Sequence, residues 1–176
     1  MKKLLKFAPL CALLLAVVAF ILLLAGEALV HDYELLGSKV HDFYSAPVVL
    51  FGNGNAVVLS ISGTVSDYKG AWNAILAFIF MIVALIVLLV SSITVFVKIK
   101  ALEKFGGIIA LVAGGLLLVA GIFLFFSKAA FGAANDIADG LKDYNLGVAW
   151  IISAILAILG GIASACPAVL ALIEKK

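Results

Sequence analysis

Apolar residues fill four long stretches of this chain, and charged residues are confined to the segments between them. The uncharged stretches cover residues 7–26, 70–97, 105–127 and 144–173. Because a hydrocarbon core about 30 Å thick needs about 20 helical residues to cross it, each stretch is long enough to span a bilayer. Backbone amides in lipid must find partners within the segment, which favours helices. The pattern predicts an all-α membrane protein, with residues 1–176 forming one integral membrane domain. The expected transmembrane helices lie at about 7–29, 70–97, 105–127 and 146–172.

The first stretch follows a basic segment, which is also how a secretory signal begins. Its uncharged part is about 20 residues long, whereas the apolar part of a usual signal has about 7–15, and "LLLAGEA" is a poor cleavage site. We therefore expect an uncleaved first span.

The lysines, which supply all twelve basic residues, predict the orientation. Eight of them lie before the first stretch, between the second and third, or after the fourth: Lys2, Lys3, Lys6, Lys98, Lys100, Lys104, Lys175 and Lys176. By the positive-inside rule, both termini are then cytoplasmic. The segments 30–69 and 128–145 are extracellular on this reading, and the protein is a multi-pass protein of the plasma membrane.

Small residues at helical spacing predict how the spans pack, because helices in lipid associate through close contact. In the third span these are Gly107, Gly114 and Gly121, and in the fourth they are Ser153, Ala157, Gly161 and Ala165. The seven-residue period in the third span is typical of a left-handed four-helix bundle.

The segments outside the membrane carry a different pattern. Leu29, Tyr33 and Leu36 keep helical spacing, so we expect the first helix to continue to Gly37. Two β-branched runs in 46–63 then flank Gly-Asn-Gly-Asn, which predicts an extracellular antiparallel β hairpin between the first two spans. In the segment 128–145, apolar residues again have helical spacing. The predicted interaction surface is the hairpin turn, made of Phe51, Gly52, Asn53, Gly54 and Asn55.

Both histidines occur in a repeated Val-His-Asp tripeptide. On the expected helix, His31 shares a face with Glu27 and Glu34, and His41 follows in the loop, a set of groups that zinc accepts. A solvated surface is the commoner role of such a cluster, so these four residues are weak metal candidates.

No other pattern indicates chemistry. No span core contains a charged residue, there is no phosphate-binding glycine loop, and no basic stripe points to nucleic acid. Cys11 and Cys166 stand alone, which favours buried structural thiols. We expect neither catalysis nor a cofactor.

Four spans, cytoplasmic termini, a long strand-rich first outer segment and a shorter second one together resemble the claudin-like superfamily. The resemblance covers the whole chain at the level of topology. It implies a left-handed four-helix bundle under a small extracellular antiparallel sheet. The family's Gly-Leu-Trp motif and paired cysteines are missing from the first outer segment, and the only comparable tryptophan is Trp72, at the start of the second span. Paracellular sealing is therefore not implied.

The sequence favours a non-enzymatic, structural or interaction protein that contacts membrane lipids and either itself or another membrane protein. One alternative is an accessory subunit of a transporter or channel. The other is a membrane enzyme or metal-binding protein that uses the extracellular His, Asp and Glu side chains.

Overall fold

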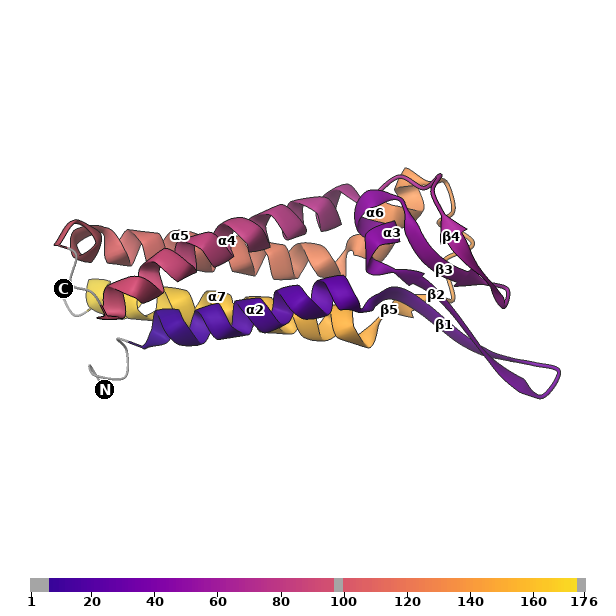
Figure 1. The fold of residues 1–176 in the computed structure, drawn as a ribbon, viewed down its shortest axis with the longest axis horizontal. Coiled ribbons are helices and arrows are strands. Elements are labelled where there is room, and N and C mark those ends of the chain that lie inside the picture. Colours follow the sequence, from indigo (N-terminus) through magenta and orange to yellow (C-terminus); the bar gives the residue numbers. More distant parts are fainter. Residues whose placement is uncertain (1–6, 97–99, 174–176) are drawn as a thin grey trace.

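The computed structural model describes residues 7–96 and 100–173 and consists of a long helical bundle with a small sheet at one end (Figure 1). Four helices are long and apolar enough to cross a membrane, which confirms a multi-pass membrane protein. They are α2 (Ala8–Ala25), α4 (Trp72–Phe96), α5 (Lys100–Phe125) and α7 (Val148–Ile173). Two shorter helices, α3 (Ala46–Phe51) and α6 (Ser127–Ala134), lie at the sheet end.

The sheet is antiparallel and has five strands in the order β4-β3-β2-β1-β5. The strands are β1 (Glu27–Leu35), β2 (Ser38–Ser45), β3 (Gly54–Val58), β4 (Ile61–Val65) and β5 (Asn145–Leu146). The prediction of a small antiparallel sheet between the first two spans is thus confirmed. The fifth strand comes from the connection between α6 and α7, so both connecting segments share one sheet. We call residues 26–71 and 126–147 together the cap.

The expected helix over 27–36 is wrong. Helix α2 ends at Ala25, and the chain turns into β1 at Gly26, where a Cβ would lie 2.4 Å from the Cβ of Ala149. Leu29 and Tyr33 also fit one face of a strand, and Leu36 lies in the turn that follows it. Pairing with β2 and β5 decides the conformation. Glu27, His31 and Glu34 therefore do not share a helix face.

The hairpin predicted around Gly52–Asn55 is misplaced. Residues 46–51 form α3, and Gly52 ends this helix in the left-handed conformation with φ 81°. The turn that joins two strands is Leu59-Ser60, between β3 and β4. Glycine after an apolar run is found both at helix ends and in hairpin turns, so the sequence pattern did not distinguish the two.

In the second connecting segment, the helix stops earlier than its spacing predicts. Helix α6 ends at Ala134, and turns follow as far as Tyr144. The side-chain amide of Asn135 bonds to the backbone of Lys69 twice. Its Nδ2 donates to the Lys69 carbonyl (2.9 Å), and its Oδ1 accepts from the Lys69 backbone N–H (2.6 Å). This pair of bonds ties the second connecting segment to the first.

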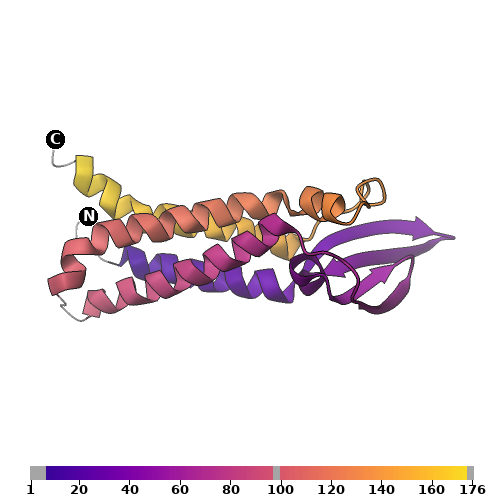
Figure 2. The same ribbon diagram turned by 90° about the horizontal axis from the view of Figure 1, so that it is seen from above.

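The four long helices form a closed ring in which α7 packs between α2 and α5, and α4 packs between α5 and α2. Figure 2 shows α5 and α7 running side by side along the bundle. Glycines line this contact: a Cβ on Gly114 would lie 2.7 Å from the Gly161 carbonyl oxygen, and one on Gly121 would lie 2.7 Å from that of Ala154. Ser153 and Ala157 are fully buried, while Gly107 and Ala165 lie nearer the surface.

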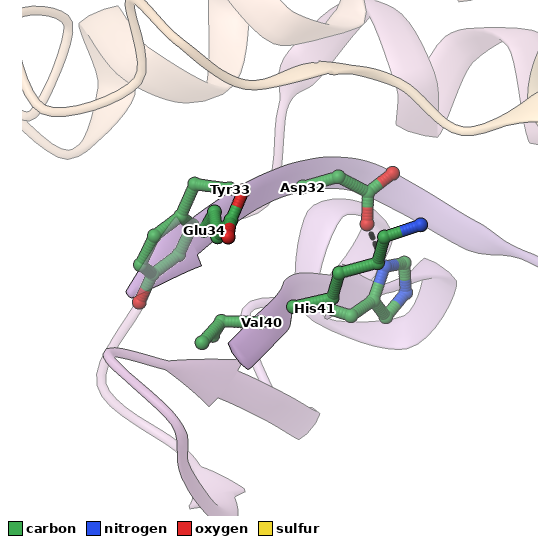
Figure 3. A pocket seen from close by; sticks show the side chains of 6 residues that line it. Asp32, Tyr33, Glu34, Val40 and His41 are labelled. Atoms are coloured by element: carbon green, nitrogen blue, oxygen red, sulfur yellow. Dashed lines mark hydrogen bonds and ion pairs between the residues drawn. The ribbon is translucent and has the colours of Figure 1, made fainter. Parts of the chain in front are cut away.

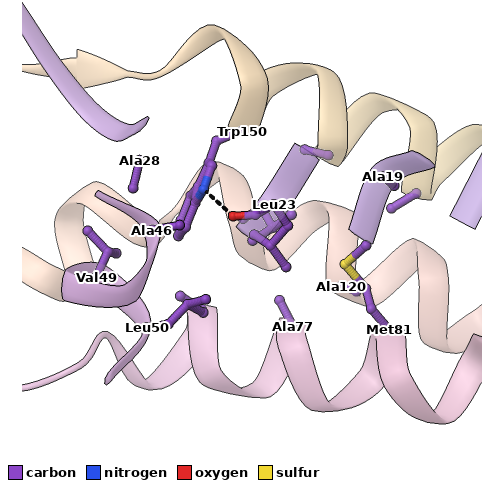
Figure 4. Close-up of a cluster of buried hydrophobic side chains, with 14 of the residues drawn as sticks. Ala19, Leu23, Ala28, Ala46, Val49, Leu50, Ala77, Met81, Ala120 and Trp150 are labelled. Atoms are coloured by element: carbon purple, nitrogen blue, oxygen red, sulfur yellow. Dashed lines mark hydrogen bonds between the residues drawn. The ribbon is translucent and has the colours of Figure 1, made fainter. Parts of the chain in front are cut away.

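Two aromatic residues near the start of the fourth apolar stretch lie inside the protein. Trp150 is 1% exposed and donates its indole N–H to the Leu23 carbonyl (3.0 Å), where α2, α7 and the cap meet (Figure 4). Tyr144 is buried in the cap. By contrast, Cys11 and Cys166 are exposed on the bundle surface, so the expectation that they are buried is also wrong.

Candidate functional site

The two Val-His-Asp tripeptides lie opposite each other in the β1–β2 ladder. His31 pairs with Asp42, and Asp32 pairs with His41. The histidine of each tripeptide therefore lies opposite the aspartate of the other tripeptide. Because side chains alternate along a strand, the two pairs point to opposite faces of the sheet.

On one face, His41 lies between two carboxylates. Its Nδ1 is 2.5 Å from Asp32 Oδ1, and its Nε2 is 3.0 Å from Glu27 Oε2 (Figure 3 shows the contact with Asp32). The hydrogen bond with Asp32, followed by the one with Glu27, raises the pKa of His41 above 6.5. The His41 bonds link Glu27, at the start of β1, to the middle of the hairpin. The side chains of His41 and Glu27 are about half exposed, so the cluster is not a closed site.

This geometry does not suit one metal ion. The two carboxylates approach opposite nitrogens of the same ring, so His41, Asp32 and Glu27 do not converge on one point. Within residues 7–96 and 100–173, no group of three or more His, Cys, Asp or Glu side chains is placed to hold a metal. Of the four sequence candidates, only Glu27 and His41 come together. His31 lies on the other face, and Glu34 pairs with Lys39 across the ladder.

The opposite face of the hairpin packs into an aromatic cluster. The His31 ring stacks on Tyr33, with centroids 4.8 Å apart, and also contacts Tyr144. Tyr44 contacts Tyr144 and the fully buried Phe131, both from the second connecting segment. Burial raises the pKa of Tyr144 to about 12 and moves that of Tyr44 in the same direction, so both stay neutral at physiological pH.

Asp42 is the buried charged residue of the cap, with 2% of its surface exposed. Its carboxylate accepts hydrogen bonds from the backbone amides of Leu59 (2.7 Å) and Ser60 (3.1 Å) and from the Tyr33 hydroxyl (3.4 Å). It therefore holds the β3–β4 turn onto β2. No local pattern predicts this role, because the contacts join residues 17 and 18 positions apart.

The predicted interaction residues Phe51–Asn55 lie where the cap meets the bundle. The Phe51 ring packs edge-on against Phe78 of α4, at 5.4 Å between centroids. Gly52 is buried beneath the chain at Tyr68, whose carbonyl oxygen would lie 1.9 Å from an added Cβ. Asn53 and Asn55 are exposed, and Gly54 is half-buried. These residues form a helix end and the start of β3, not a projecting turn.

Strand β4 forms one edge of the sheet. It pairs with β3 on one side, and its residues Ile61 to Thr64 are all exposed. Gly63 has no atom within 4 Å of the position of a Cβ. An edge strand carries unpaired backbone groups that accept another strand, and Lys, Pro and bulges are the usual protection. None of these protections occurs in "ISGTV".

No family model and no curated protein matches this chain. The assignment of a function therefore depends on the geometry of the cap and the bundle.

Proposed function

We propose that this protein is a non-enzymatic, claudin-like tetraspanning protein of the plasma membrane that acts by contact with membrane proteins, in the first place with a second copy of itself. In this proposal both termini are cytoplasmic, the cap is extracellular, and the helices form a left-handed bundle. The lysine distribution and the position of the cap at one end of the bundle support it.

The observation that carries the proposal is the unprotected edge of β4. In a two-residue hairpin the pair Val58–Ile61 next to the turn is hydrogen-bonded, and hydrogen-bonded pairs then alternate along the ladder. Ser62 and Thr64 consequently direct their backbone N–H and C=O groups away from β3. A second strand can pair there by adding to the sheet.

The edge is self-complementary. In an antiparallel pair of β4 strands centred on Gly63, Ser62 of each copy faces Thr64 of the other, and these are the residues with outward backbone groups. Gly63 faces its own copy at the two-fold axis, where the missing side chain leaves room. A C₂ contact of this kind uses the same surface patch on both subunits.

The bundle gives independent support for a role without transport. None of the four described spans contains Asp, Glu, Lys, Arg or His. The buried polar groups of Ser153, Ser164 and Asn73 are used in bonds to carbonyls of neighbouring helices. A membrane pathway for ions usually needs polar or ionisable groups that face it.

The contact can be tested by a cysteine at the proposed axis. In a Cys11→Ala, Cys166→Ala background, Gly63→Cys should form a disulfide-linked dimer in native membranes under mild oxidation. Residues that face each other in a non-hydrogen-bonded antiparallel pair have Cα atoms about 4.5 Å apart, within the range for a disulfide. Ser38→Cys, exposed at the β1–β2 turn, is the matched control and should stay monomeric.

A second substitution separates edge pairing from random collision. Thr64→Pro removes an outward N–H but keeps the contacts with β3, because proline is tolerated on edge strands. It should abolish the Gly63→Cys crosslink. The proposal is overturned if Gly63→Cys crosslinks no better than Ser38→Cys, or if Thr64→Pro leaves its crosslinking unchanged. Crosslinking of native membranes followed by mass spectrometry would then identify a different partner.

A further inference from the structure

Both two-residue turns of the cap begin with leucine in the left-handed conformation. The β1–β2 turn is Leu36-Gly37 and the β3–β4 turn is Leu59-Ser60. Leu36 has φ 51° and is 99% exposed, and Leu59 has φ 52° and is 74% exposed. The same unusual choice thus occurs at two independent turns.

Stability does not explain these leucines. Turns of this type have positive φ at both central residues, and Asn, Asp and Gly are the residues that accept it. For leucine the left-handed conformation costs about 1–2 kcal/mol. The exposed side chains gain no burial within the protein in return. Residues held in unfavourable backbone conformations at surface positions often serve function.

Each tip also carries a second exposed apolar residue. Leu35, next to the first turn, is 53% exposed, and Ile61, next to the second, is 74% exposed. Figures 1 and 2 show that the two turns lie at the end of the cap away from the bundle, with the β1–β2 turn reaching farthest. The molecule therefore presents two apolar points on its distal side.

We propose that the leucine-tipped turns insert into the surface of a second bilayer facing the cap, so that the protein has its helices in one membrane and its hairpin tips in another. The inference rests on the proposed position of the cap in water. It is independent of self-association through β4.

The composition of the tips favours lipid over a protein pocket. Energetically dominant residues of protein interfaces are enriched in Trp, Tyr and Arg, and leucine is under-represented. The tips contain none of the three enriched types, and the chain has no arginine at all. Apolar side chains such as leucine do insert at the boundary of acyl chains and headgroups. Two points on separate hairpins can enter such a surface independently, without a complementary shape.

The charges beside the first tip balance, because Glu34 lies opposite Lys39 in the ladder. The second tip is flanked by serines. Attraction to anionic headgroups therefore contributes little, and binding to phosphatidylcholine should change little with salt.

The experiment uses the full protein in phosphatidylcholine nanodiscs, which cover the bundle, mixed with phosphatidylcholine vesicles and separated by flotation. We expect the protein to float with the vesicles, and empty nanodiscs to stay behind. The double variant Leu36→Asn, Leu59→Asn should bind at least tenfold more weakly, because burying even part of each leucine is worth about this factor. Asn suits positive φ, so this variant should fold at least as well as the native chain.

Leu36→Met with Leu59→Met is the matched control, because it keeps both tips apolar and should float like the native protein. A Leu36→Cys variant lacking Cys11 and Cys166, labelled with an environment-sensitive dye, should show a blue shift when vesicles are added. No flotation, or equal flotation of the Asn and native proteins, overturns the inference. Binding only to native membranes that carry protein, lost after protease treatment, also overturns it and points to a protein receptor.

Failure of this inference is distinguishable from failure of the proposed function. The Asn variant leaves β4 intact and should still form the Gly63→Cys dimer. A water-soluble maleimide should also label Ser38→Cys in nanodiscs without vesicles, since the cap then lies in water.

Discussion

Ser153 and Ser164 each donate a hydrogen bond to a carbonyl of a neighbouring helix, Ala19 (2.7 Å) and Ala110 (2.8 Å) respectively. Ser153→Ala should destabilise the bundle by about 0.5–2 kcal/mol, because interhelical bonds in membranes are of this size. Reversible unfolding in mixed micelles with SDS measures it. The control is Ser92→Ala: the buried Ser92 hydroxyl has no partner in the described structure, so its removal should cost nothing. Equal losses for both would contradict the assignment.

His41 predicts a pH dependence of the cap. Its pKa is raised above 6.5 by Asp32 first and Glu27 second, so the folded state binds the proton more tightly than the unfolded chain. This stabilisation is fully present below about pH 6.5 and is lost as the pH rises through the raised pKa. The stability difference between native protein and His41→Gln, measured by amide hydrogen exchange in β1 and β2, should shrink over that range. The change in stability should be small, because Asp32 is 76% exposed and its interaction with His41 is screened by water. Asp32→Asn should lower the His41 pKa measured by NMR, and an unchanged pKa would contradict the assignment.

At the scale of elements, the contact between α5 and α7 depends on glycine. Gly114→Ala places a methyl group 2.7 Å from the Gly161 carbonyl and 3.2 Å from the Ala165 Cβ, so the helices must separate. A loss of about 1–3 kcal/mol is expected from such overpacking. Gly115→Ala, at the next position but with no neighbour within 4 Å, should be neutral or slightly stabilising. The same unfolding assay compares the two, and a larger loss at Gly115 would place the contact elsewhere.

The β3–β4 hairpin depends on a charged residue from another strand. Asp42→Ala leaves the amides of Leu59 and Ser60 without their acceptor and should destabilise the turn by about 2–3 kcal/mol, since bonds to charged groups are the stronger ones. Hydrogen exchange at these two amides should accelerate while exchange in α2 and α7 stays slow. Asp42→Asn keeps one acceptor and should have a smaller effect. Unchanged exchange would show that the turn does not need Asp42.

The helices were predictable from sequence and the cap largely was not, for a physical reason. A span such as Val148–Leu170 is defined by its own composition, since lipid selects any long apolar segment. The strand at 27–35 is defined by pairing with β2 and β5, one of them more than a hundred residues away. Similarly, no local pattern indicates that Asp42 reaches Leu59. The two hairpin turns were also hidden, because "LG" and "LS" begin with leucine where two-residue turns usually begin with Asn, Asp or Gly.

For the whole molecule, the arrangement places the cap at one end and the start of α2 and the end of α7 at the other (Figure 1). The positive-inside rule then predicts the sidedness in cells. In a Cys11→Ala, Cys166→Ala background, an impermeant maleimide should label Ser38→Cys on intact cells. It should label Ile173→Cys only after permeabilisation. Both side chains are exposed, so the difference in labelling reports on which side of the membrane each position lies. A protein with the opposite orientation would give the reverse result. Its leucine tips would then face the cytoplasmic side, and the second bilayer they contact would be an internal membrane.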